Sequence, residues 1–274
     1  MAAWSLLLTC GIIPLRAAEQ DGVLRLRDRA TISRQEFYRE LAGIPVIYVG
    51  ENHDNPAHHL AQLQIISALQ EKGIPLAIAA EMFLTGDQPM LDQWVAGAID
   101  EEQFGRFFQE RWRISWGLYR DIFRYARQQR IPIIGINIPR EIVRKVAASG
   151  FGSLTAAERK ELPADVTCII DPAYKGFIHK IFSTHQGERS FDYFCEAQML
   201  WTKGMARNLA VYRSRNPKRT IVVLTGIGHA LRPGIPTYFH DLDPEPYRIV
   251  SPELVDLNRE NATTSDLDYL LLDQ

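Results

Sequence analysis

Four apolar runs, three of them introduced by an Ile-Pro pair, constrain the fold more than any other feature of this chain. The runs are "GIPVIYVG" from Gly43, "GIPLAIAAEMF" from Gly73, "RIPIIGINIPRE" from Arg130 and "TIVVLTGIGH" from Thr220. Proline lacks the backbone donor that the interior of a strand needs, so it belongs at a strand's start. Runs that are apolar almost throughout are typical of strands covered on both faces of a parallel sheet.

Helical patterns separate these runs. In "NPAHHLAQLQIISALQEKG", Asn55 is a suitable N-cap and Pro56 a suitable first helical residue. In "GLYRDIFRYARQQR", we expect one apolar stripe, formed by Leu118, Ile122, Tyr125 and Ala126. Strands that alternate with helices predict an α/β fold with a mainly parallel central sheet flanked by helices.

The domain organisation predicted from these patterns is simple. The chain has 274 residues, of which 46% are hydrophobic, enough for one full core. We expect a single α/β domain over residues 21–245, with helical insertions near 84–117 and 140–215. The last ~40 residues, after "GHALRPGIPTYF", are Pro-rich and then acidic, and we expect them to form an irregular edge and a partly ordered C-terminal tail over residues 246–274.

Residues 1–20 have the pattern of a signal or lipoprotein leader. The apolar stretch from Trp4 to Leu15 is too short to span a bilayer and is similar to the apolar region of a secretory signal. The string "LLTC" is similar to a lipoprotein cleavage box, with Cys10 as the residue that would carry the lipid. We therefore expect an exported protein, either periplasmic or anchored at the membrane surface through Cys10.

Cysteine use and charge exclude several classes of protein. The three cysteines, Cys10, Cys168 and Cys195, show no CxxC spacing, so a disulfide framework or a structural zinc is not expected. We expect Cys168 and Cys195 to be buried thiols, with a disulfide between them as the alternative in an exported chain. The net charge of −2, from 31 basic and 33 acidic residues, gives no attraction for nucleic acid.

Polar side chains stand at the end of every apolar run. These residues are Glu51 and His53, then Glu81, then Asn137 and Arg140, and finally His229. Ligands of open α/β sheets bind beyond the carboxyl ends of the strands, so we expect a shared pocket there. Adjacent helical residues point about 100° apart, so we expect only one of His58 and His59 to face that pocket.

These residue types allow two kinds of site. Glu51, His53 and His229 could bind a divalent metal with an open position for water. A hydrolase would use the same three residues and Glu81, with Glu51 as general base. The other possibility is haem, held in an aromatic slot with an axial Tyr, His, Cys or Met. The chain contains no GxSxG, GxxxxGK[ST] or HExxH motif, and no GxGxxG follows a strand.

Five ordered strings resemble the ChaN-like haem-binding family of bacterial exported proteins and lipoproteins. They are "YVGENHDNPAHHLAQLQII", "AAEMF…DQPMLDQWVAG", "IIGINIPREIVRKVAASG", "EAQMLWTKGMA" and "VVLTGIGHALRPGIP", and they cover residues from about 45 to 240. This family lies within a wider group of Tiki/TraB-like and erythromycin esterase-like proteins. The resemblance implies haem binding linked to iron uptake, in a homodimer that sandwiches paired haems. It also implies a tyrosinate on the iron and a histidine near the propionates.

The resemblance also suggests residue roles. Tyr174, in "DPAYKGFIHKIF", is our first choice for the haem ligand and Tyr193 the second, with His179 and His58 as further cofactor-binding residues. Lys175 and His179 would stabilise the Tyr174 phenolate if that segment is helical. The leading hypothesis is an exported haem-binding protein whose haem lies in a pocket near a dimer interface. The alternative is a metal-dependent or Glu/His-assisted hydrolase, since similar motifs carry such activities in relatives.

Overall fold

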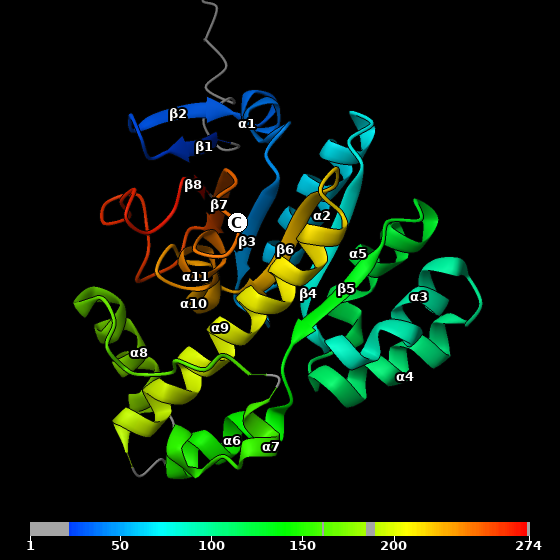
Figure 1. Ribbon diagram of the computed structural model, residues 1–274. Coiled ribbons are helices and arrows are strands. Elements are labelled where there is room, and N and C mark those ends of the chain that lie inside the picture. The colour runs from blue at the N-terminus through cyan, green and yellow to red at the C-terminus, as the bar shows by residue number, and fades with distance from the viewer. Residues whose placement is uncertain (1–21, 161, 185–189, 273–274) are drawn as a thin grey trace, which may run out of the picture.

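The computed structural model describes residues 22–160, 162–184 and 190–272, which form an eight-stranded sheet with helices on both faces (Figure 1). The strand order is β2-β1-β8-β7-β3-β6-β4-β5. The strands are β1 Gly22–Arg25, β2 Ala30–Ser33, β3 Val46–Glu51, β4 Leu76–Leu84, β5 Ile133–Asn137, β6 Thr220–Gly226, β7 Tyr247–Pro252 and β8 Tyr269–Leu271. The predicted leader, residues 1–20 with Cys10, lies outside the described residues.

The predicted α/β fold with a mainly parallel central sheet is confirmed. The four apolar runs are β3, β4, β5 and β6, which lie together and pair in parallel. Pro45, Pro75 and Pro132 each stand directly before a strand, where no ladder donor is lost. The sheet is mixed, however, because β1 pairs antiparallel with both β2 and β8.

The C-terminal segment was predicted wrongly. Residues 246–274 were expected to form a partly ordered tail, but β7 pairs in parallel with β3, and β8 pairs with β7 and β1. Ile249 and Val250 of β7 are fully buried. These strands are short and flanked by prolines and acidic residues, so their local pattern is weak. Their stability comes from pairing with strands far away in the sequence.

Two apolar layers cover the sheet, one on each face. Side chains alternate along β3, so Ile47 and Val49 face one layer whereas Val46 and Tyr48 face the other. The first layer contains α1 Arg34–Leu41, α2 Pro56–Glu71, α3 Gln88–Ala96, α4 Glu101–Trp112 and α5 Trp116–Gln128. The second contains the C-terminal half of α9 Phe191–Arg215, with α10 Ile227–Ala230 and α11 Ile235–His240.

The second helical insertion has a core of its own. It packs α6 Arg140–Ser149 and α8 Pro172–Thr184 with the N-terminal half of α9, whereas the short helix α7 Ala156–Arg159 has no buried residue. Short 3-10 turns, Thr85–Asp87 and Phe151–Ser153, lie in the two insertions. None of the helices in the described ranges is long and apolar enough to cross a membrane.

The N-cap predicted for α2 is confirmed, whereas the apolar stripe predicted for α5 is shifted along the helix surface. The Asn55 side chain accepts a hydrogen bond from the amide of Ala57, as expected of an N-cap. The buried face of α5 consists of Tyr119, Ile122, Phe123 and Ala126, so it lies about one residue away from the predicted stripe. This shift brings the Tyr119 hydroxyl into the interior.

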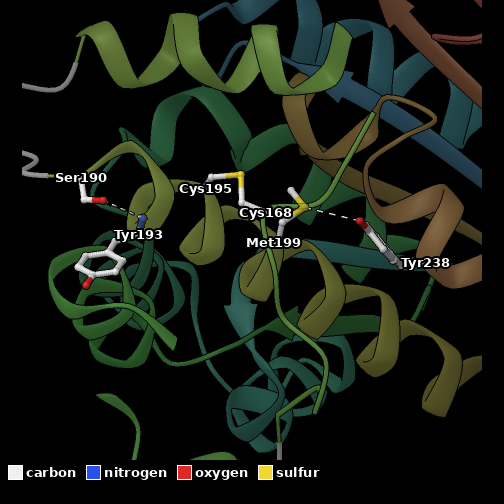
Figure 2. Close-up of a disulfide and its surroundings, with 6 residues drawn as sticks. All are labelled: Cys168, Ser190, Tyr193, Cys195, Met199 and Tyr238. Carbon is white, nitrogen blue, oxygen red and sulfur yellow. Dashed lines mark hydrogen bonds between the residues drawn. A yellow bond between two sulfur atoms is a disulfide. The ribbon is translucent and has the colours of Figure 1, made fainter. Parts of the chain in front are cut away.

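Cys168 and Cys195 form a disulfide, so the prediction of two thiols was wrong (Figure 2). Their Cα atoms are 5.5 Å apart, within the range that a disulfide requires. Cys195 is fully buried in α9, and Cys168 lies four residues before the start of α8. Tertiary packing of the loop before α8 against α9 brings the two sulfur atoms together across 27 residues of sequence.

Candidate functional site at the strand ends

Glu51, the last residue of β3, is the centre of a buried polar network. Its Oε1 accepts a hydrogen bond from the Tyr119 hydroxyl at 2.5 Å and lies 2.8 Å from Nδ1 of His53. Its Oε2 accepts from Nε2 of Gln62 at 2.7 Å and lies 3.3 Å from Nδ1 of His59. Burial opposes ionisation, but hydrogen bonds from His53 and His59 lower the pKa of Glu51 to about 2.

His53 connects this carboxylate with the surface. Its side chain is 36% exposed and packs edge-on against the Trp112 ring, with the ring centroids 4.9 Å apart. The Trp112 indole in turn donates to the Tyr119 hydroxyl at 3.3 Å. Burial opposes protonation, but the hydrogen bond with Glu51 and the charge of Glu81 raise the pKa of His53. His53 is therefore the partly accessible titratable group of the network.

Glu81 and His229 form the second half of the network. Oε2 of Glu81 accepts hydrogen bonds from the Thr225 hydroxyl at 2.5 Å and the Gly226 amide at 2.8 Å. Oε1 of Glu81 lies 4.0 Å from Nε2 of His229, and Nδ1 of His229 is 2.9 Å from the Thr202 hydroxyl. Burial lowers the pKa of His229. The ring is therefore neutral at pH 7.

Gly226 lies where the two halves meet. A Cβ atom at this position would lie 2.9 Å from Cε1 of His53 and 3.8 Å from Oε2 of Glu81. The absence of a side chain thus allows the imidazole of His53 to approach the end of β6. The structure brings together Glu51, His53, Glu81 and His229, as expected from strands that end at one sheet edge.

The predicted divalent metal site is not formed. Within residues 22–160, 162–184 and 190–272, no group of three or more His, Cys, Asp or Glu residues could hold a metal ion. The predicted set was Glu51, His53 and His229, but both oxygens of Glu51 already face hydrogen-bond donors. His229 faces Thr202 and Glu81 instead of joining Glu51.

The remaining strand-end residues lie beside the network. Nδ2 of Asn137 donates to the Glu81 carbonyl at 2.6 Å, and the Trp201 indole donates to Oδ1 of Asn137. Arg140, also predicted to lie at this edge, is the first residue of α6 and is exposed.

We expected only one of His58 and His59 to face the pocket; His59 is the one that faces Glu51, and both rings are buried. Nδ1 of His58 accepts from the Asn52 amide at 2.9 Å, and its Nε2 is 2.9 Å from Nδ2 of Asn55. Both ring nitrogens of His58 are thus engaged within the loop before α2. His59 faces Glu51 and packs against the Tyr119 ring at 4.0 Å.

Sequence reasoning missed several members of the network. Tyr119 and Gln62 lie on otherwise apolar faces of α5 and α2, and Thr202 lies on α9. A polar side chain on an apolar stripe was the available signal for Tyr119 and Gln62. The sequence offers no signal for Thr202, since its partner is 27 residues away.

The candidate haem ligands lie in the second helical insertion and differ in accessibility. Tyr174, in α8, is buried and its hydroxyl donates to the Gly228 carbonyl at 2.9 Å. Burial raises the pKa of Tyr174 well above its usual value. Tyr193, near the start of α9, is 40% exposed. Among the described residues its hydroxyl has no hydrogen-bond partner, and Figure 2 shows its ring beside Ser190 and away from the disulfide.

Lys175 and His179 do not surround the Tyr174 phenol as expected. Nζ of Lys175 lies 5.7 Å from the centre of the Phe191 ring, and the imidazole of His179 packs against the same ring at 4.8 Å. The aromatic residues of the first insertion are core, because Trp94 and Phe104 stack at 4.4 Å and are almost fully buried. The accessible aromatic side chains of the second insertion are a better candidate for a haem slot.

Comparisons with known proteins agree with this architecture. Residues 37–239 match the family model described as haem-binding uptake, Tiki superfamily, ChaN. A solved structure showing cofacial haem binding to ChaN of Campylobacter jejuni is similar, with a TM-score of 0.74 and 20% identity over 93% of this chain and 97% of that chain. An erythromycin esterase mutant, EreC in its open conformation, gives a TM-score of 0.52 and 13% identity over 80% of this chain and 72% of that chain. No curated protein matches the chain.

Proposed function

Because the chain belongs to the haem-binding uptake family of the Tiki superfamily, represented by ChaN, we propose that it binds haem and functions in haem or iron acquisition. When bound, haem supplies an iron that accepts an oxygen ligand from a tyrosine. The observation in this chain that carries the proposal is the Tyr193 phenol. It is 40% exposed, and its hydroxyl is unpaired among the described residues.

The Tyr193 ring packs over Gly150, and other aromatic side chains of the second insertion lie on α8 and at the start of α9. Gly150 has φ +79°, and a Cβ there would lie 2.8 Å from Cε1 of Tyr193, so the glycine makes room for the ring. Two residues before Tyr193, the Phe191 ring packs against His179 and lies 5.6 Å from the Phe182 ring. Tyr193 therefore replaces Tyr174 as our first choice of axial ligand, because Tyr174 would have to leave the Gly228 carbonyl and its buried position.

A hemin titration followed by absorption spectroscopy tests the proposal. We expect saturable binding by the wild type, with a shifted Soret band and a tyrosinate-type charge-transfer band. Tyr193→Phe should lose that band, whereas Tyr174→Phe and the control Tyr125→Phe should retain it. Loss of the band in Tyr174→Phe alone would move the ligand to Tyr174. Absence of saturable binding by the wild type would contradict haem binding itself.

We also propose that the protein is exported, either to the periplasm or as a lipoprotein anchored through Cys10. The Cys168–Cys195 disulfide supports this proposal, since such bonds persist in oxidising compartments. Cell fractionation and mass analysis of the mature N-terminus provide the test. Recovery of the intact chain with Met1 from the cytoplasm, with both thiols reduced, would contradict it.

Haem is proposed to lie near a homodimer interface. The Ile169 side chain, which follows Cys168, is 89% exposed, and Tyr193, two residues before Cys195 in α9, is 40% exposed. Apolar surface of this kind at a ligand site is suited to a second subunit. Light scattering with and without hemin should give the mass of a dimer in the loaded state, and a monomer at full loading would contradict it.

A Glu/His-assisted hydrolase remains the second candidate, because Glu51 orients the partly exposed His53. Since both oxygens of Glu51 are engaged, His53 and not Glu51 is the group able to accept a proton from water. His53→Gln should then abolish turnover of an activated aryl ester. Equal turnover by the variant, or none by the wild type, would remove this candidate.

A further inference from the structure

Three arginines, Arg113, Arg140 and Arg144, form what we call the arginine rim at the open side of the strand-end network. Arg113 directly follows Trp112, whose ring packs on His53 at 4.9 Å. Arg140 lies three residues after Asn137, whose side chain donates to the Glu81 carbonyl. Arg144 lies one turn further along α6. The rim thus approaches the network from α4 on one side and from α6 on the other.

The charges of the rim are not neutralised by neighbouring acids. No hydrogen bond or ion pair joins any of the three guanidinium groups to another residue in the described part of the chain, and all three residues are exposed. Other arginines of α4 and α5 are paired, as Arg111 is with Asp87 at 2.9 Å and Arg124 with Glu101 at 2.7 Å.

Arg140 lies close enough to Arg113 and to Arg144 for their charges to repel its own. Partial desolvation of the guanidinium group and the positive charges of Arg144 and Arg113 lower the pKa of Arg140, whereas the charge of Glu81 acts in the opposite direction. Arg140 and Arg144 are also four residues apart on one helix, a spacing at which like charges are destabilising. The fold therefore holds these cations together although their mutual repulsion opposes it.

Neighbouring groups increase the positive potential. The helix α6 begins at Arg140, and its N-cap, Pro139, has no side-chain acceptor for the amides of the first turn. His53, on the network side, is 36% exposed and has a raised pKa, but the ionised Glu51 beside it offsets its charge. The acidic groups nearby are Glu51 and Asp54, whose charges act on His53, Glu81, which is engaged by Thr225 and Gly226, and Glu141 in the first turn of α6.

We propose that the arginine rim binds an anionic group, a carboxylate or a phosphate, of a ligand that reaches the strand-end network. Guanidinium groups bind both kinds of oxyanion through charge-assisted, often bidentate hydrogen bonds. Two sources of such a group are compatible with the rim. One is the pair of propionates of haem, which rests on the function proposed above. The other is a separate small phosphate compound, which does not.

Two titrations distinguish these sources. In the first, calorimetry measures binding of inorganic pyrophosphate to the haem-free protein at low salt. In the second, absorption spectroscopy compares haem with haem dimethyl ester, which lacks the propionate charges. Each titration uses wild type, Arg140→Gln, Arg140→Lys, and Arg120→Gln as a control that removes an exposed arginine of α5.

Arg140→Gln should weaken binding of the relevant anion roughly tenfold or more, as expected for loss of a charge-assisted hydrogen bond. Arg140→Lys should recover part of this loss, and Arg120→Gln should have no effect. If Arg140→Gln no longer binds haem more tightly than its dimethyl ester, the anionic groups at the rim are the haem propionates. If Arg140→Gln loses only pyrophosphate binding, the rim binds a separate phosphate compound. Thermal stability of Arg140→Gln should be unchanged or higher, because a repulsion is removed.

Unchanged binding by Arg140→Gln in both titrations would overturn the arginine rim as a binding site. A lower thermal stability of this variant would also overturn it, since Arg140 would then have a structural role. Failure of the wild type to bind haem would contradict the proposed function only, because the pyrophosphate titration still decides whether the rim binds anions.

Discussion

Glu51 is a buried carboxylate whose charge is maintained by the donors around it. Because its pKa is lowered to about 2, its ionised form stabilises the folded state above the unfolded pKa, and that contribution is lost as the pH falls through about 2. The difference from an ordinary glutamate corresponds to about 3 kcal/mol. Glu51→Gln should therefore lower the free energy of unfolding at pH 7 by about this amount.

Urea denaturation at pH 7 and pH 2 measures this effect. The difference between wild type and Glu51→Gln should shrink at pH 2, where the wild-type carboxylate begins to be protonated in the folded state. Glu110→Gln, a change at an exposed position of α4, is the control and should have little effect at either pH. An equally large difference in unfolding free energy at both pH values would mean that packing, and not charge, explains the lower stability of Glu51→Gln.

At the scale of elements, the close contact between β4 and β5 depends on Gly135. A Cβ there would lie 2.1 Å from the Leu84 carbonyl oxygen, where the register of the two strands shifts. Gly135→Ala should destabilise the fold by more than about 3 kcal/mol, because backbone would have to move. Gly86→Ala, in the following 3-10 turn, has open space around its Cβ and should change stability by less than about 0.5 kcal/mol.

Thermal unfolding of the two glycine variants provides the measurement. Equal midpoints for Gly135→Ala and wild type would show that the β4–β5 contact is not as close as described. A displaced β5 would also move Asn137, which binds the Glu81 carbonyl. The same variant should therefore disturb the strand-end network.

The disulfide between the loop before α8 and the helix α9 constrains the second insertion. It links residues separated by 27 positions, for which loop closure predicts a stabilisation of about 3 to 4 kcal/mol. Replacing both cysteines by serine should lower the unfolding free energy by this order and raise amide exchange in α8. A reducing agent should destabilise the wild type but leave the double variant unchanged. Equal exchange in α8 with and without the disulfide would contradict this role.

At the scale of the whole molecule, the C-terminal strands complete the sheet. β7 lies between β3 and β8, and β8 connects to β1. A chain that ends at residue 245 would expose the edge of β3 and remove Ile249, Val250 and Leu270 from the core. We expect this chain to lack cooperative unfolding, whereas Val255→Ser, at a side chain that is 95% exposed, should unfold as the wild type does. Near-UV circular dichroism and urea denaturation of the shortened chain, Val255→Ser and wild type provide the test. A cooperative unfolding transition in the shortened chain would contradict the expectation.

The sequence by itself determined the parallel core of the sheet and the polar residues at its edge. Proline positions, continuous apolar runs and helix caps act over a few residues, so they indicate where each strand begins and which polar residues stand at its end. This is why Glu51, His53, Glu81 and His229 could be identified from local patterns alone. The resemblance to the ChaN family also came from strings of this kind, and the family match over residues 37–239 confirmed it.

Only the tertiary structure decided which of these residues have partners. Tyr119 reaches Glu51 across 68 residues, Cys168 joins Cys195, and β7 pairs with a strand about 200 residues earlier in the chain. The accessibility of Tyr193 and the burial of Tyr174 were decided in the same way. Local patterns record backbone preference and average burial. Pairing, exposure and the direction of a polar side chain depend on how distant elements pack, which no local pattern contains.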